Sequence, residues 1–236
     1  MRIFFQLNLK ITSCLILLAG SMVWSTALYG QQKTPDYKNP NLPISVRIND
    51  LISRMTLREK VRQMDMYSGH NAGQNQLSPN KHRTIKQFEH IIGTRGIGAI
   101  HDLYPASAKE ANKIQRYAIT HTRLGIPVLF FEEGLHDYGG AGSTVFPQSI
   151  GLSSTWDTSL VRKVGHAIGA EARAHGMDML FCPVLGLARD PRWGRVEETY
   201  GEDPYLDGAM GVAMVKGLQG KTLTSNSSVI AEPKHF

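Results

Sequence analysis

The chain has 236 residues, of which 42% are hydrophobic, so it is long enough and apolar enough to bury a sizeable core. Its formal charge is +6, from 26 basic and 20 acidic residues. Arg2 and Lys10 belong to a segment that we expect to be removed, and the remaining basic surplus is small and dispersed. We therefore expect neither nucleic acid nor an anionic membrane as a partner.

The N-terminus has the layout of a secretory signal peptide. Two basic residues precede an apolar stretch from Ile11 to Trp24, and the small residues Ser25 and Ala27 follow it. A membrane anchor is the alternative, but about 14 apolar residues fall short of the ~20 that a spanning helix needs. We predict a signal peptide over residues 1–30, a polar linker over 31–41, and a secreted or periplasmic protein without stable membrane insertion after cleavage.

Removal of this segment leaves Cys182 as the only cysteine, so no disulfide can form within the remaining chain. Export without disulfides suits an enzyme whose core is large enough to be stable unaided. The nine histidines show no paired spacing such as His-x-x-x-His. We therefore predict no metal site and no cofactor, and the oligomeric state stays open.

The folded part is predicted to begin near Leu42, giving a domain over residues 42–236. Helices are expected where a capping residue precedes apolar residues at intervals of three or four. The first helix is the stretch after Pro43 with Ile48, Leu51, Ile52 and Met55, and the next two begin at the capping boxes Thr56–Glu59 and Ser107–Glu110, the latter helix ending near Gly125. A fourth begins at Asp157, with Leu160, Val161, Val164 and Ile168 facing inward, and ends at Gly176. A fifth begins at Asp203 with Pro204 and runs through Leu218.

Short apolar runs alternate with these helices and predict strands: Gly98 to Leu103, Ile126 to Phe131, Met177 to Leu185, and Val229 to Ile230. Runs without polar alternation indicate strands covered on both faces, as in a parallel sheet wrapped by helices. The order favours either an α/β barrel or a doubly wound sheet.

Polar residues gather where these apolar runs end, which favours the barrel. In a barrel the strand ends converge at one rim, whereas a doubly wound sheet uses the single crevice where strand order reverses. No Gly-x-Gly-x-x-Gly loop supports the second fold. We predict an α/β fold of the (β/α)8 type, a TIM barrel lacking its last strands. The polar residues at the ends of the apolar runs are, in chain order, His101 and Asp102; Glu132, Glu133 and His136; Arg189 and Asp190; and Lys234 and His235.

Three segments carry candidate chemistry. Residues 125–137 bring the adjacent carboxylates Glu132 and Glu133 and the histidine His136 to a strand end, either for a ligand or for an ion pair with an arginine. Residues 181–204 hold arginines, a tryptophan and acids that suit a sugar, although a salt-bridge network is the better reading for five of them individually. Residues 231–236 contain adjacent Lys and His after a strand, which on spacing alone is weak evidence for a ligand site. The five residues for which a salt-bridge network is the better reading are Arg189, Asp190, Arg192, Glu197 and Glu198.

Together the three segments resemble glycoside hydrolase family 3 from about Leu51 to the last residue. The resemblance lies in Pro-x-x-Phe-Phe-Glu-Glu-Gly-Leu-His, Val-Phe-Pro-Gln with residues 151–157, Arg-Asp-Pro-Arg-Trp-Gly-Arg with Tyr-Gly-Glu-Asp-Pro, and Lys-His-Phe, in the family's order. It implies that Glu133, Arg195, Lys234 and His235 contact the sugar whose bond is cleaved. Asp137 stands where relatives commonly have glycine, which leaves the shape of that loop open.

The resemblance also implies a retaining β-glucosidase-like enzyme, which needs two carboxylates about 5 Å apart. The nucleophilic aspartate and the acid/base glutamate of the family would both lie beyond Phe236. We therefore assign no catalytic residue in this chain, treat it as C-terminally truncated, and expect it to be inactive alone towards its oligosaccharide or glycoside substrate.

Three alternatives remain. The first is a β-xylosidase or α-L-arabinofuranosidase of the same family. The second is its β-N-acetylhexosaminidase branch, whose Asp-x-Glu-Gly-Gly stretch the loop at 131–136 does not fit. The third is a non-catalytic carbohydrate-binding or scaffold protein, although an open barrel would expose unpaired strand edges.

Overall fold

The computed structural model describes residues 34–70, 83–103, 107–140 and 142–235. The predicted signal peptide lies outside the described residues. The chain divides into two compact units, Met1–Arg54 and Met55–Phe236, which are described separately. The predicted limits of the linker and of the barrel domain stay predictions.

The first unit contains a 3-10 helix η1 (Asp36–Lys38) and helix α2 (Ile44–Arg54). The backbone N–H of Tyr37 donates to Asp50 Oδ2 at 3.0 Å, and Arg47 Nε donates to the Tyr37 carbonyl at 3.1 Å. These bonds attach the short helix to α2. The helix predicted after Pro43 is confirmed.

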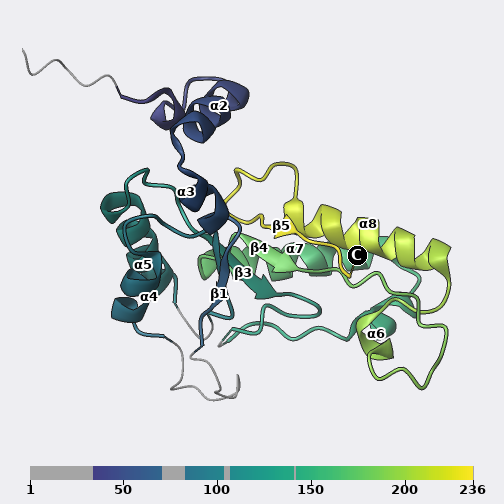
Figure 1. Ribbon diagram of the computed structural model, residues 1–236. Coiled ribbons are helices and arrows are strands. Elements are labelled where there is room, and N and C mark those ends of the chain that lie inside the picture. The colour runs from purple at the N-terminus through teal and green to yellow at the C-terminus, as the bar shows by residue number, and fades with distance from the viewer. Residues whose placement is uncertain (1–33, 71–82, 104–106, 141, 236) are drawn as a thin grey trace, which may run out of the picture. The chain divides into compact units, whose positions relative to one another are not determined.

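The second unit is organised by a parallel sheet of five strands (Figure 1). They lie side by side in chain order, without the reversal of strand order that a doubly wound sheet requires. The α/β fold with strands in barrel order is therefore confirmed. The strands are β1 (Met66–Ser68), β2 (Ala99–His101), β3 (Leu129–Glu133), β4 (Met179–Phe181) and β5 (Ile230–Ala231).

Four helices of the second unit, α3 (Leu57–Arg62), α5 (Ala108–His121), α7 (Thr158–Ala174) and α8 (Pro204–Gln219), begin at the predicted capping residues. Thr56 and Glu59 form a reciprocal capping box, and Asp157 accepts the N–H groups of Ser159 and Leu160 at 2.9 and 3.0 Å. The other described helices are α4 (Ile85–Ile92), α6 (Ser149–Ser153) and η2 (Val196–Glu198).

The predicted inward face of α7 is confirmed at three positions and wrong at one. Val161, Val164 and Ile168 are buried, whereas Leu160 is 38% exposed because it lies outside the stripe that contacts α8 and the sheet. The helix after Ser107 ends at His121, four residues before Gly125. Among the described elements, β1, α4, α6 and the two 3-10 helices η1 and η2 were not predicted.

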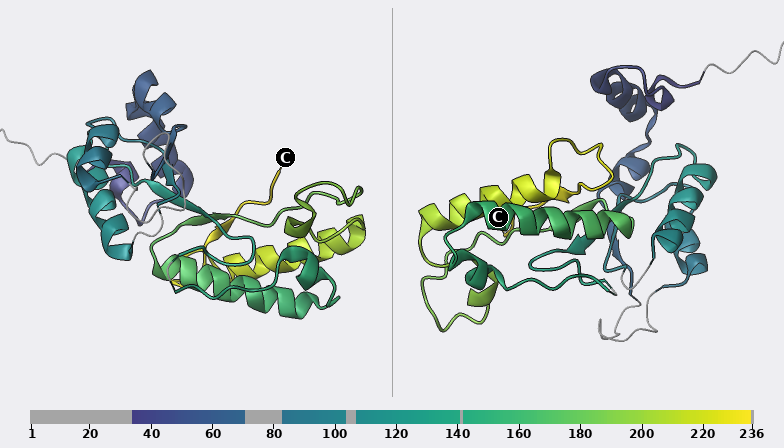
Figure 2. Two further views of the ribbon diagram at one scale, coloured as in Figure 1. Left: turned by 90° about the horizontal axis from the view of Figure 1, so that it is seen from below. Right: turned by 180° about the vertical axis from the view of Figure 1, so that it is seen from behind.

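Helices α7 and α8 lie side by side in all three ribbon views (Figures 1 and 2). Gly165 and Gly217 allow this approach, since a Cβ on Gly217 would come 2.4 Å from the Arg162 carbonyl oxygen and 3.0 Å from the Gly165 Cα. Met210 and Met214 of α8 are buried in the core, and a Cβ on Gly165 of α7 would come 2.8 Å from Met214 Sδ. The core therefore fixes the sheet against this helix pair.

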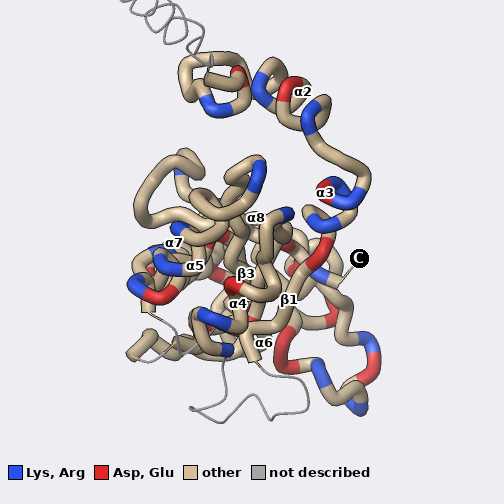
Figure 3. The backbone as a smooth tube through the Cα atoms, turned by 60° about the vertical axis from the view of Figure 1, so that its left-hand side comes forward, with Lys and Arg blue, Asp and Glu red and all other residues tan. Residues whose placement is uncertain are grey.

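Basic and acidic positions are interspersed along the second unit (Figure 3), as the small dispersed surplus of the sequence predicts. Among the described residues, no helix has the length and apolar character to cross a membrane.

Candidate active site

Three of the four predicted sugar-binding residues lie at a strand end or shortly after one. Glu133 is the last residue of β3, and Lys234 and His235 come shortly after β5. Arg195 lies in the loop that leaves β4. The carboxyl ends of parallel strands meet at one edge of a sheet, so the topology brings these segments together.

Glu133 and Lys234 form an ion pair across β3 and the segment after β5. Lys234 Nζ lies 2.5 Å from Glu133 Oε2. The Lys234 side chain is 13% exposed and that of Glu133 is 49% exposed. The cation is therefore enclosed, while the carboxylate still faces the space above the strand ends.

The backbone of Lys234 is held by the segment after β4. Its N–H donates to the Pro183 carbonyl at 2.9 Å, and its carbonyl accepts the N–H of Leu185 at 2.7 Å. Val184 lies beside Lys234 in a parallel bridge. This extends the β4–β5 pairing to the site and fixes where the Lys234 side chain begins.

Aromatic and sulfur groups lie beneath the ion pair. Lys234 Nζ is 5.7 Å from the centroid of the Phe181 ring, which packs against Phe131 with centroids 5.5 Å apart. Cys182 is buried, and this burial raises the pKa of its thiol to about 12. A neutral, buried thiol gives the site no nucleophile, so Cys182 serves as packing.

Arg195 connects the second half of the site. Its Nε and Nη2 donate to the two carboxylate oxygens of Glu198 at 2.8 and 2.5 Å, and Nη2 lies 3.4 Å from His235 Nε2. The hydrogen bond from Arg195 lowers the pKa of Glu198, and the charges of Lys234 and His235 lower it further. Glu198 in turn raises the pKa of Arg195, with a smaller contribution from Glu133.

All four predicted residues therefore belong to one cluster. Glu133 contacts Lys234, and Arg195 contacts His235. The Lys234–His235 peptide bond is cis. The geometry joins the two pairs into one charged rim, and the role of each residue towards a sugar stays a prediction.

Other polar residues at the strand ends have structural contacts. Glu132 points to the opposite face from Glu133, is fully buried, and accepts the N–H of Leu103 at 2.5 Å. His136 contacts the Phe146 carbonyl through Nδ1 at 3.1 Å. Of Glu132 and Glu133, only Glu133 reaches the rim.

The loop of residues 181–204 contains ion pairs for three of the five residues for which the sequence favours them, namely Asp190, Arg192 and Glu198. Arg192 donates through Nε and Nη2 to the carboxylate of Asp190, at 3.0 and 2.7 Å. Glu198 pairs with Arg195 rather than standing apart from the site. Sequence reasoning treated Glu198 as part of a loop network and missed that it orients a predicted sugar-binding arginine. The spacing Arg-x-x-Glu across one turn was the available signal.

His101 and Asp102 form a separate pair at the end of β2. His101 Nδ1 lies 2.9 Å from Asp102 Oδ2, and this hydrogen bond lowers the pKa of Asp102. Within the described residues, no group of three or more His, Cys, Asp and Glu side chains is arranged to hold a metal ion.

Residues 56–236 match the family model described as the glycosyl hydrolase family 3 N terminal domain. This chain belongs to glycosyl hydrolase family 3. The match covers the sheet and every residue of the charged rim, so the resemblance carried by the sequence motifs is confirmed.

Curated members of family 3 resemble the chain over most of its length. A putative β-xylosidase of Formosa agariphila is 36% identical over 213 residues, which make up 88% of this chain and 28% of that protein. A periplasmic β-glucosidase of Salmonella typhimurium is 33% identical over 189 residues, covering 80% of this chain and 23% of that protein.

Solved family 3 structures share the fold. A β-glucosidase from Erythrobacter marinus superposes with a TM-score of 0.70 at 32% identity, covering 87% of this chain and 27% of that one. A β-glucosidase from Listeria innocua in complex with glucose gives a TM-score of 0.66 at 33% identity, covering 80% and 26%. The chain thus spans about a quarter of the length of these relatives.

Proposed function

We propose that the protein to which this chain belongs hydrolyses terminal β-glycosidic bonds as a β-glucosidase, and that Glu133, Arg195, Lys234 and His235 bind the sugar whose bond is cleaved. The observation that carries this proposal is the cluster itself. Residues 101 positions apart in the sequence meet at 2.5 Å, at the edge of the sheet where barrel enzymes bind substrate.

The chemistry of the rim suits sugar hydroxyl groups. A carboxylate accepts two hydrogen bonds from neighbouring hydroxyls, and guanidinium and ammonium groups donate to hydroxyl oxygens. Lys234 holds one oxygen of Glu133, and the half-exposed carboxylate keeps the other side open to solvent. The rim thus offers both donors and an acceptor to the hydroxyl groups of a sugar.

The bond-breaking groups are proposed to lie outside this chain. A retaining mechanism uses one carboxylate that attacks the anomeric carbon and one that donates and then accepts a proton, about 5 Å apart. By the family resemblance both would follow Phe236. The chain alone is therefore proposed to bind sugar weakly and to hydrolyse nothing.

A β-xylosidase is the second candidate, favoured by the relative from Formosa agariphila that is named a putative β-xylosidase. Xylose lacks the hydroxymethyl group of glucose, so the two activities differ in whether the site accommodates that group. The ratio of kcat/KM for aryl β-glucoside and aryl β-xyloside, measured on the complete protein, decides between them.

Export to the periplasm or beyond is proposed from the N-terminal pattern, and two relatives carry the name periplasmic β-glucosidase or periplasmic β-glucosidase/β-xylosidase. N-terminal sequencing of the protein recovered from its native cells tests this. A mature protein that begins shortly after residue 27 is expected, and one that retains Met1 would contradict it.

The variant Glu133→Gln tests the site in the complete protein. The amide cannot hold Lys234 as a counter-charge and loses a charged acceptor, so kcat/KM for the better aryl glycoside should fall about 100-fold. The matched control is Asp190→Asn, which removes another half-exposed carboxylate that is paired within its own loop. Its kcat/KM should stay within about twofold, and an equal fall in both variants would refute the assignment.

A further inference from the structure

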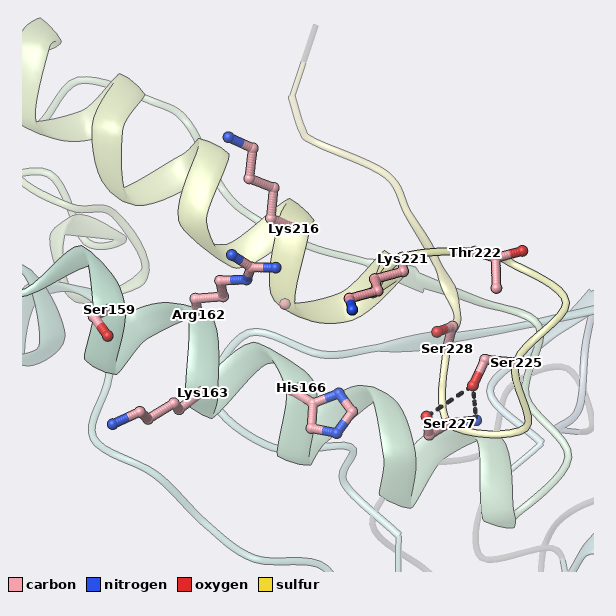
Figure 4. A pocket seen from close by; sticks show the side chains of 12 residues that line it. Ser159, Arg162, Lys163, His166, Lys216, Lys221, Thr222, Ser225, Ser227 and Ser228 are labelled. Atoms are coloured by element: carbon pink, nitrogen blue, oxygen red, sulfur yellow. Dashed lines mark hydrogen bonds between the residues drawn. The ribbon is translucent and has the colours of Figure 1, made fainter.

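A hollow lies on the outer helical layer, between α7 and the segment that follows α8. Its volume is about 560 Å³. Figure 4 shows the Arg162 guanidinium and the Lys221 ammonium group extending towards the space between these elements, with the His166 ring on the α7 side. The side chains of Lys163 and Lys216 extend outwards from the same rim.

Two glycines shape this hollow. Gly217 brings the backbones of α7 and α8 into contact, and it leaves no side chain above the contact. Gly220 ends α8 at a φ of +59°, and a Cβ there would come 2.7 Å from Ser228 Oγ. The turn can therefore fold back over α7, which creates the hollow.

The charges around the hollow are all of one sign. Arg162, Lys163, Lys216 and Lys221 line it, and no Asp or Glu does. None of these four cations has an ion-pair partner among the residues that the structure describes. Elsewhere in the second unit, arginines such as Arg123 and Arg195 hold carboxylates. Four uncompensated cations around one concave site attract an anion.

Hydroxyl groups supply further donors. The segment after α8 contributes Thr222, Ser225, Ser227 and Ser228 to the lining. Ser225 Oγ lies 3.0 Å from Ser227 Oγ and accepts the Ser227 N–H at 3.2 Å, so the segment is held as a turn. Guanidinium, ammonium and hydroxyl donors around one space suit an anion with several oxygen atoms.

We propose that this pocket binds a tetrahedral oxyanion, sulfate or phosphate, either free or as the ester group of a sugar. A divalent oxyanion offsets more of the positive charge than a single carboxylate does, and Arg162 can meet two of its oxygens at once. The volume lies within the range of small-molecule sites and exceeds what one small anion fills, so there is room for a sugar that carries the group. This site is separate from the strand-end cluster and does not depend on the proposed glycosidase activity.

Calorimetric titration of the full chain tests the proposal. The probes are inorganic sulfate, inorganic phosphate, glucose 6-sulfate and glucose 6-phosphate, at constant ionic strength with chloride as the balancing anion. Unmodified glucose controls for binding at the strand-end site. We expect saturable binding of one equivalent of at least one of these anions, and affinity at least tenfold weaker in the double variant Arg162→Gln/Lys221→Gln.

The matched control is Arg58→Gln/Lys60→Gln, which removes one exposed arginine and one exposed lysine from α3. It should retain the affinity of the unmodified chain. Esters that bind at least tenfold tighter than the inorganic anions identify a modified sugar as the ligand, and equal affinities identify the free anion. Absence of saturation, equal losses in both double variants, or tighter binding of a short DNA duplex than of any ester would overturn the proposal.

Discussion

Glu59 and Glu133 each hold one cation in the second unit, Arg123 and Lys234 respectively, with a shortest N···O distance of 2.5 Å in both pairs. The Glu59 side chain is 4% exposed, and both of its oxygens are used. Oε1 accepts Arg123 Nε at 2.8 Å, and Oε2 accepts Arg123 Nη2 and the N–H and hydroxyl of Thr56. The Glu133 side chain is 49% exposed and is bonded by Lys234 through Oε2.

This difference separates a structural carboxylate from a candidate binding carboxylate. Glu59 has no capacity left for a ligand, because the capping box of α3 and the Arg123 fork already satisfy it. Glu133 is positioned by one cation and remains half open to solvent. The first should therefore matter for stability and the second for binding.

The largest stability effect is expected from Glu59→Gln. The amide can still close the capping box, as Gln87 does at α4, but it cannot pair with Arg123. We expect the free energy of unfolding to fall by about 2–3 kcal/mol, with KM unchanged in the complete protein. Glu110→Gln is the matched control, since it alters the capping box of α5, and it should cost less than about 1 kcal/mol in urea titration. Equal losses would mean that the Arg123 pair contributes little.

Acid should remove the same contribution. The Arg123 hydrogen bonds lower the pKa of Glu59 from its ordinary value of 4.5 to about 2. A lowered pKa stabilises the fold above pH 4.5, and the contribution is lost as the pH falls towards 2. The difference in unfolding free energy between the unmodified chain and Glu59→Gln should shrink by about 2 kcal/mol from pH 6 to pH 3. A difference that stays constant over this range would contradict the ion-pair account.

A smaller effect, on binding, is expected from Arg195→Lys in the complete protein. Lysine cannot reproduce the two-pronged bond to Glu198 or the approach to His235, so KM should rise about tenfold. Arg192→Lys is the matched control, because Arg192 makes the same fork with Asp190 while its side chain is 89% exposed. Its KM should not change, and a similar rise in both would make Arg195 a loop-stiffening residue only.

The fold was predictable where local chemistry decides it. Thr56 and Asp157 each precede an apolar stripe, and each caps the helix that follows it. Apolar runs marked four of the five strands. Helix α4 was also predictable, since Thr84 and Gln87 form a capping box that sequence reasoning overlooked. Strand β1 was not, because its three residues Met66–Ser68 form no apolar run and are a strand only through pairing with β2.

The site was predictable as a set of residues but not as a set of contacts. The motifs indicated Glu133, Arg195, Lys234 and His235, whereas the pairing of Arg195 with Glu198 depends on the turn at η2. The exposure of Leu160 likewise depends on which side of α7 faces α8. This pairing and this exposure are set by tertiary packing, which overrides any pattern within one helix.

Asp207 extends the comparison to a buried carboxylate that has no ion-pair partner among the described residues, and the smallest effect is expected there. It lies in the first turn of α8 at 5% exposure, and burial raises its pKa, although the Tyr200 N–H donates to it. Its Oδ1 has no hydrogen-bond partner among the described residues. The charged form is therefore disfavoured in the folded chain above the ordinary pKa of 3.8.

Asp207→Asn removes that charge and keeps an acceptor for the Tyr200 N–H. The unfolding free energy at pH 7 should rise by less than about 1 kcal/mol, and the gain should disappear below pH 3.8, where the acid is neutral in both states. Asp203→Asn is the control, because asparagine caps a helix as well as aspartate does and this N-cap is exposed. A loss of stability in Asp207→Asn alone would show that the buried carboxylate makes a charged contact within the core, which would place it with Glu59 as a structural acid.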